Sequence, residues 1–155
     1  MNNALGLPGF LPSLVRTGAK ATDNLIVPAM MGHWHGDARI TMAWCQRPTL
    51  PVAIEIHTSG QVTGTVGDAT LTNALFQENR GWLGRHLHLA TPYVIIGSLQ
   101  GALVAAESIV RERVRIALDF TGGSFRGGLN TSGSNFGGKQ TMWLVARPLE
   151  LVRQA

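Results

Sequence analysis

Apolar and polar residues alternate along most of the chain from Gly32 onward. In the run GHWHGDARITMAW (32–44), Trp34, Met42 and Trp44 occupy one set of positions, and His33 and His35 occupy the other. Successive side chains of a β-strand point to opposite faces of the sheet, so this alternation predicts a strand with one buried face. The same period of two is found in PVAIEIHT (51–58), QVTGTVGDATLTNALF (61–76) and IVRERVRIALDF (109–120).

Short glycine-containing segments separate these runs. SG (59–60) and TGG (121–123) are typical of hairpin turns, and Gly67-Asp68 is expected to bend or break its strand. Two segments are predicted to be loops: QENRGWLGRHLHLATP (77–92), whose role the sequence leaves open, and TSGSNFGG (131–138). Further strands are expected in YVIIGSLQGALV (93–104), SFRGGLN (124–130) and KQTMWLVARPLELV (139–152), the last interrupted by Pro148.

The number and spacing of these strands indicate the fold class. Seven or eight short strands joined by short turns, without intervals of helix length, predict an all-β antiparallel meander. Such a meander protects its edges by closing, so we predict a single antiparallel up-and-down β-barrel of about eight strands, with a two-sheet sandwich as the alternative. We predict that residues 32–155 form this barrel domain. Residues 1–31, which lack the period of two, are expected to be an N-terminal arm or short helix packed on the barrel.

Two of the predicted strands, YVIIGSL (93–99) and TMWLVA (141–146), are apolar on both faces. Their outer faces should therefore be covered as well as their inner ones. The N-terminal arm is one candidate for this cover, and a contact between copies of the chain in a homo-oligomer is the other.

Composition narrows the classes of protein that fit this fold. The 155 residues suffice for one domain, and 45% hydrophobic against 14% charged residues excludes a disordered chain. No run of about 18 apolar residues is present, so no membrane helix is expected. The net charge of +4 is modest and scattered, which does not favour nucleic acid as a partner. Cys45 is the single cysteine and the start of the chain lacks a secretory signal pattern, so we expect a cytoplasmic protein.

Two short segments resemble a known family. Gly32-x-Trp34 on the first strand, with Arg147 on the last strand placed to pack over that tryptophan, resembles the calycin pattern shared by lipocalins and avidins. KQTMWLVAR (139–147) also looks like the end of an avidin, in which the tryptophan lines the ligand pocket, and Trp143 is the matching position. The resemblance implies a calycin-like barrel that binds a small apolar ligand inside. GTVGDATLT (64–72) and NRGWLGR (79–85) are similar to uncharacterised bacterial proteins, which implies no function.

The inward positions of the predicted barrel define a candidate ligand site. A pocket of this kind is mostly apolar and fixes its ligand with few polar groups. We therefore predict non-covalent binding of a small apolar molecule, without a cofactor, and expect Trp82 on a lid over the interior. The residues predicted to line the interior are Trp34, Met42, Trp44, Ile54, Ile56, Glu112, Leu118, Met142 and Trp143.

Glu112 supports an alternative function. If its strand keeps its register, Glu112 faces inward with Val110 and Val114, and a buried acid must find a partner, shift its pKa or meet water. The chain would then be a barrel enzyme of the isomerase or cyclase kind, with Glu112 as its acid or base and an arginine such as Arg126 as partner. A solvated Glu112 at the end of its strand is the simpler interpretation. A third possibility is a filled barrel that acts as a homo-oligomeric assembly subunit.

The histidines are the remaining chemical candidates. His33 and His35 face outward if Trp34 faces inward, and His57 on the next strand is expected opposite Asp37 to Arg39. Neighbouring residues on the same face of a strand are about 7 Å apart, whereas zinc needs its ligands about 2 Å from one point. We therefore predict surface histidines and no metal site.

Overall fold

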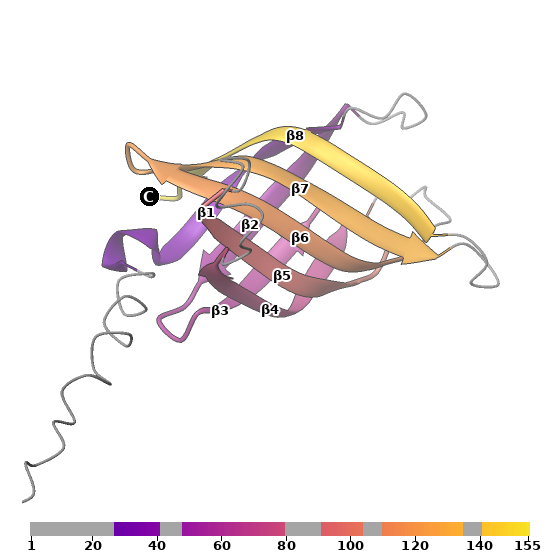
Figure 1. The fold of residues 1–155 in the computed structure, drawn as a ribbon, viewed down its shortest axis with the longest axis horizontal. Coiled ribbons are helices and arrows are strands. Elements are labelled where there is room, and N and C mark those ends of the chain that lie inside the picture. Colours follow the sequence, from indigo (N-terminus) through magenta and orange to yellow (C-terminus); the bar gives the residue numbers. More distant parts are fainter. Residues whose placement is uncertain (1–26, 41–47, 80–90, 104–109, 135–140) are drawn as a thin grey trace, which may run out of the picture.

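The computed structural model describes residues 27–40, 48–79, 91–103, 110–134 and 141–155; for 110, 111, 134 and 141–143 it describes the backbone alone. Eight strands curl around one axis to form a barrel (Figure 1). A 3-10 turn, η2 (Pro28–Met30), immediately precedes the first strand. The strands are β1 (Gly32–Ile40), β2 (Thr49–Ile56), β3 (Gln61–Val66), β4 (Ala69–Glu78), β5 (Tyr93–Gln100), β6 (Val110–Thr121), β7 (Ser124–Ser134) and β8 (Thr141–Arg153).

Each strand pairs with the next one in antiparallel orientation, and β1 pairs with β8 to close the barrel. In the closing pair Trp34 lies opposite Arg153 and Ala38 opposite Leu149. The predicted all-β antiparallel barrel is therefore confirmed, and the sandwich alternative is wrong. Closure gives each of these eight strands a neighbour on both sides, which removes the usual route of edge-to-edge aggregation for this architecture.

The turns agree with the glycine signals in the sequence. β6 and β7 are joined by Gly122 and Gly123, both with positive φ (64° and 81°), between the paired residues Thr121 and Ser124. A two-residue turn with two positive φ angles follows the right-handed twist of its flanking strands, and glycine adopts it without steric cost. Gly67 and Asp68 likewise separate β3 from β4.

Five of the strand pairs shift their register by a bulge or irregularity. These shifts lie in β1–β8, β3–β4, β4–β5, β6–β7 and β7–β8. A bulge puts two residues of one strand opposite one residue of its neighbour, so the alternation of faces is interrupted at that point. Counting odd and even positions therefore no longer gives the correct face of the sheet for residues beyond each bulge.

The barrel interior is the hydrophobic core. Buried side chains alternate with exposed ones on β1, β2, β3 and β6, as the sequence predicts. On β5, Val94 is 2% exposed and lies outside the core cluster, whereas Ile96 is 43% exposed. Cover of this strand by the arm or by a second copy of the chain stays a prediction. The predicted arm at residues 1–31 falls largely on residues 1–26, which lie outside the described residues.

One segment predicted to be a loop is part of a strand. Thr131 to Ser134, from the run TSGSNFGG, continue β7 and pair with both β6 and β8. Their serines and glycine have little strand propensity, but hydrogen-bonding neighbours on both sides outweigh propensity in the middle of a sheet.

Candidate functional site

Aromatic side chains fill one end of the barrel interior. Phe125 lies at the centre, with ring centroids 4.7 Å from Trp34, 4.9 Å from Phe120 and 5.8 Å from Phe76. Tyr93 stacks on Phe76 at 5.3 Å. These are normal distances for favourable aromatic pairs. We call this end, where β1 begins and β6 turns into β7, the aromatic end.

The turn η2 and the last residues of β8 close the aromatic end. Trp34 donates a hydrogen bond from its indole Nε1 to the carbonyl of Met30 at 2.9 Å, and both residues are buried. The guanidinium of Arg153 lies over the Trp34 ring, 4.7 Å from its centroid, and donates to the carbonyl of Ala29. Residues 29–30 are thus bound both to β1 and to β8.

Arg153 occupies the role that the sequence pattern assigned to Arg147, so the prediction for Arg147 is wrong. Register explains the difference: β8 pairs with β1 such that Arg153 lies opposite Trp34, whereas Ala146 lies opposite Ile40, at the other end of β1. Arg147 is exposed, and a Cβ built on Gly128 would lie 2.5 Å from its Cγ, which places its stem over Gly128.

The opposite end of the interior has a different composition. Thr131 is 1% exposed there, and in the strand pairing it lies opposite Val114 on β6 and Leu144 on β8. It follows Phe125 by six positions on β7, which corresponds to roughly 20 Å along a strand. We call this the Thr131 end. Buried residues that lie toward it are Ala38, Ile40, Leu50, Val66, Ala69, Leu71, Leu99, Leu103, Val114, Leu144 and Ala146.

The Thr131 hydroxyl has no hydrogen-bond partner within the described part of the chain, although its oxygen is buried. Thr131 is also the one buried polar residue among those described. Sequence reasoning missed it because it lay in the predicted loop. The available signal was the alternation of Phe125, Leu129 and Thr131 on one face of β7.

Four of the predicted lining residues are buried in the core: Trp34, Ile54, Ile56 and Leu118, each 3% exposed or less. Trp34 belongs to the aromatic end, where protein side chains pack around its ring. The other three lie toward the same end, because Ile54 and Ile56 are on the part of β2 that pairs with the start of β1, and Leu118 pairs with Tyr93. Met42, Trp44 and Trp82 lie outside the described residues. The backbone of Met142 and Trp143 belongs to β8 at the Thr131 end, and their side chains are not described.

Glu112 does not face the interior; it is exposed. The register of β6 against β7 shifts between Arg111 and Arg113, so Glu112 lies at an irregularity and the alternation that would have turned it inward is broken. Of its expected partners, Arg126 instead pairs with Glu150 at 3.4 Å. The simpler interpretation, a solvated carboxylate near the end of its strand, fits the structure.

Two of the outward histidines, His33 and His57, lie near the carboxylate of Glu55. His33 and His35 are exposed as predicted, but His57 does not lie opposite Asp37 to Arg39. The pairing of Gly32 with Ile56 puts it beyond the start of β1, because the two strands pair in a different register from the expected one, with Thr49 opposite Arg39. Glu55 Oε1 lies 3.6 Å from His33 Nε2 and 3.7 Å from His57 Nδ1. Within the described ranges, no three His, Cys, Asp or Glu side chains could hold a metal ion.

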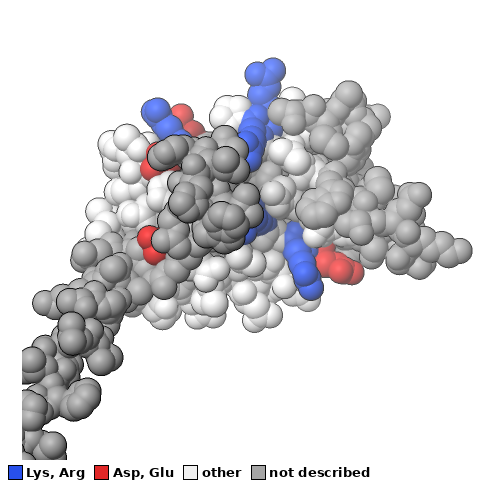
Figure 2. Space-filling view, in the orientation of Figure 1, with Lys and Arg blue, Asp and Glu red and all other residues white. Residues whose placement is uncertain are grey.

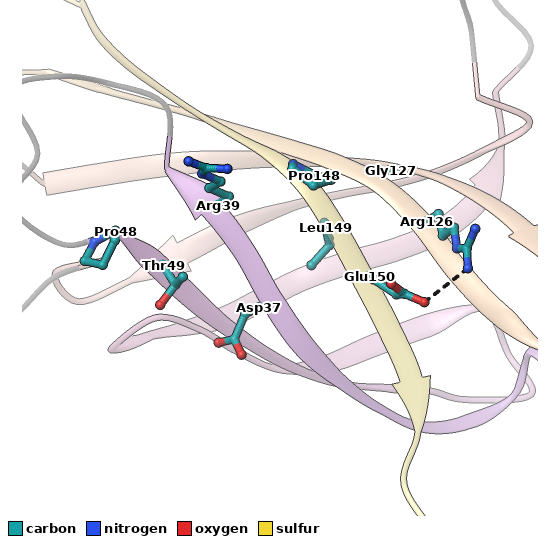
Figure 3. Close-up of a pocket in the computed structure, with 9 residues that line it drawn as sticks. All are labelled: Asp37, Arg39, Pro48, Thr49, Arg126, Gly127, Pro148, Leu149 and Glu150. Atoms are coloured by element: carbon teal, nitrogen blue, oxygen red, sulfur yellow. Dashed lines mark hydrogen bonds and ion pairs between the residues drawn. The ribbon is translucent and has the colours of Figure 1, made fainter.

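A groove of about 560 Å³ lies on the outer face of the barrel, over β1, β2, β7 and β8 (Figure 3). Arg126 and Glu150, which both line it, form an ion pair at 3.4 Å, with side chains 67% and 55% exposed. Asp37 and Arg39 contribute one further charge of each sign from β1 (Figure 3). The groove therefore has no excess charge to select an anion or a cation, and its charged groups remain well solvated.

Arginines on the outer face are dispersed. Arg113 and Arg115 are exposed on β6, and Arg115 donates to Asn79 Oδ1 at 3.4 Å. On the face shown in Figure 2, Lys and Arg side chains stand at several separate places, some beside an acid. Such an arrangement gives little of the continuous positive potential that attracts a phosphate backbone.

The single tyrosine, Tyr93, sits at the rim of the aromatic end. Burial raises the pKa of its phenol above the ordinary value of 10.0, and the nearby negative charges of Glu78 and Asp119 raise this pKa further. The folded barrel therefore favours the neutral phenol over the phenolate.

Comparison with known protein families, curated proteins and solved structures finds no match to this chain. A search of the described residues for a helix long and apolar enough to cross a bilayer also finds none. The site must therefore be judged on its own geometry.

Proposed function

We propose that the protein binds a small, mainly apolar molecule non-covalently inside its barrel, at the Thr131 end. The observation that carries this proposal is the uneven distribution of side-chain types in the interior: the aromatic side chains that the structure describes gather at the opposite end. The Thr131 end is lined by aliphatic and small residues and one hydroxyl. An apolar lining with few polar groups is typical of small-molecule pockets.

The calycin resemblance is a second support. A barrel of eight antiparallel strands, with Gly32-x-Trp34 on its first strand and an arginine of its last strand over the tryptophan, is what that resemblance implies. Arg153 supplies the arginine in place of Arg147. Because η2 and Arg153 pack over the aromatic end, the Thr131 end, to which the backbone of the predicted Trp143 belongs, is the end that we propose for ligand entry.

The alternatives from the sequence have less support. The enzyme alternative depended on an inward Glu112, which is exposed. The assembly alternative needs an apolar outer surface, and Leu75 and Ile96, paired across β4 and β5, supply a small one at 53% and 43% exposure. Among the side chains that the structure describes, this neighbouring pair falls well short of the contiguous patch that marks a stable interface.

Native mass spectrometry of the full chain as purified tests the proposal directly, because it reports bound ligand and subunit number together. We expect a population heavier than the bare chain, which loses the excess mass when the protein is unfolded. Ala146→Leu is the matching variant, because Ala146 is fully buried toward the Thr131 end. Ala53→Leu, which places the same larger side chain on the exposed face of β2, is the control.

The two variants separate a ligand-binding barrel from a filled one. If the Thr131 end accommodates a ligand, the larger side chain of Ala146→Leu occupies part of that space, and the variant loses the bound mass at little cost in stability. In a filled barrel the added carbons overpack the core and destabilise it by about 1–3 kcal/mol. Destabilisation of that size, together with a bare mass for the wild-type chain, would exclude the proposed function.

A further inference from the structure

The buried hydroxyl of Thr131 is unusual for its surroundings. A hydroxyl transferred from water to an apolar site without a hydrogen bond costs about 1–3 kcal/mol in proteins. Valine has nearly the same shape and equal preference for strands, so it would fill the position without that cost. The chain nevertheless places threonine there, opposite Val114 and Leu144, with Oγ1 unpartnered among the described residues.

A buried water is a poor partner for this hydroxyl. Ordered waters inside proteins make about three hydrogen bonds to polar groups around them. Thr131 is the single buried polar residue that the structure describes, and the neighbouring backbone of β6, β7 and β8 is engaged in the strand ladder. A water at this position would therefore leave most of its own hydrogen bonds unmade.

We infer that Thr131 is the polar contact of the interior site, and that the ligand is an apolar molecule with one hydrogen-bonding group directed at Oγ1. This inference rests on the proposed function and adds the class of ligand to it. The hydroxyl can donate or accept, so the ligand group is a carbonyl, ether, hydroxyl or N–H. Because a single polar contact orients an otherwise apolar molecule, Thr131 sets the orientation of the bound ligand.

The test uses three bicyclic probes of equal shape: indene, which has no polar atom, indole, which donates through its N–H, and benzofuran, which accepts through its oxygen. Isothermal titration calorimetry measures the affinity of each for the full chain. We expect the wild-type protein to bind indole or benzofuran about fivefold more tightly than indene, since a net hydrogen bond is worth this much. The identity of the preferred probe tells whether Oγ1 accepts or donates.

Three variants isolate the hydroxyl. Thr131→Val should bind indene as the wild type does and lose the preference for the polar probe, whereas Thr131→Ser should keep it. Without probe, Thr131→Val should raise the folding equilibrium constant about fivefold or more, because it removes an unsatisfied buried group. Thr65→Val is the matched control on the exposed face of β3 and should change neither quantity more than about twofold.

Each other outcome has a definite meaning. Equal wild-type affinity for all three probes overturns the inference and leaves the proposed function standing. A preference that persists in Thr131→Val assigns the polar contact to another residue and overturns the inference as well. A Thr131→Val chain that is less stable than wild type shows that the hydroxyl already has a partner, with the same consequence. If none of the probes binds, the proposed function fails and the inference with it.

Discussion

Replacing Arg153 by methionine tests how the aromatic end is held together. Methionine keeps much of the apolar length of the side chain and removes the guanidinium. Two interactions are lost: the contact with the Trp34 ring at 4.7 Å and the hydrogen bond to the Ala29 carbonyl. A cation over an aromatic ring at an exposed site is worth about 0.5–1 kcal/mol. The hydrogen bond adds about 1 kcal/mol, a value at the low end for charged donors because Arg153 is exposed.

Together these terms predict that Arg153→Met lowers the free energy of unfolding by about 2 kcal/mol, a change of more than about tenfold in the ratio of folded to unfolded chain. Urea denaturation followed by tryptophan fluorescence measures it, and an unchanged m-value would show that the same surface is exposed on unfolding. Arg147→Met is the matched control, since it removes the same charge from the same strand. Its effect should stay within about 0.5 kcal/mol because Arg147 is exposed on the outer face of β8.

Equal losses in the two variants would refute this account, because they would trace the effect to net charge rather than to the contact with Trp34. A loss below about 0.5 kcal/mol in Arg153→Met would refute it too, since neither interaction would then be stabilising.

Two further predictions follow from close packing and from burial. A Cβ at Gly127 would lie 1.8 Å from the backbone oxygen of Ala117, whereas a Cβ at Gly128 would meet the flexible side chain of Arg147. Gly127→Ala should therefore lower the free energy of unfolding by about 3 kcal/mol or more, and Gly128→Ala by about 1 kcal/mol; thermal denaturation would show the larger drop in melting temperature for Gly127→Ala. Tyr93 is the single tyrosine, so the ultraviolet absorbance of phenolate reports its ionisation alone, with a midpoint above pH 10.0 that Glu78→Gln lowers. Because the pKa of Tyr93 is higher in the folded chain than in the unfolded chain, its contribution to stability is present below about pH 10 and is lost as the pH rises through the folded-state pKa. A titration midpoint at or below pH 10.0 would contradict the effect of burial.

The period of two made the fold predictable. Trp34, Ala38 and Ile40 are buried on β1 while His33 and His35 are exposed, and the SG and TGG turns fall where the glycines placed them. Alternation depends on local geometry alone, so one chain carries the information without relatives.

The errors have physical origins. Glu112 was assigned to a face by counting positions, and a bulge lies next to it in β6–β7. Arg147 was placed over Trp34 by a family pattern, whereas the register of β8 against β1 puts Arg153 opposite that tryptophan. His57 was misplaced because alternation tells which face a residue occupies but not which residue of the next strand lies opposite it. Thr131 was missed because its neighbours are poor strand formers, and only pairing with β6 and β8 makes them a strand.

The pairing of β1 with β8 also sets the order in which the chain can fold. About 120 residues separate Gly32 from Arg153, so this contact is among the least local that the described fold contains, and barrels of such topology fold in milliseconds to seconds. During synthesis, roughly 5–25 s pass between the completion of β1 and the completion of β8, its second neighbour. Throughout that interval one edge of β1 is open to other chains. The polar and charged side chains of His33, His35, Asp37 and Arg39 along its outer face are the kind of residue that discourages such pairing. These four side chains would then protect the unfinished chain, before β8 has been synthesised.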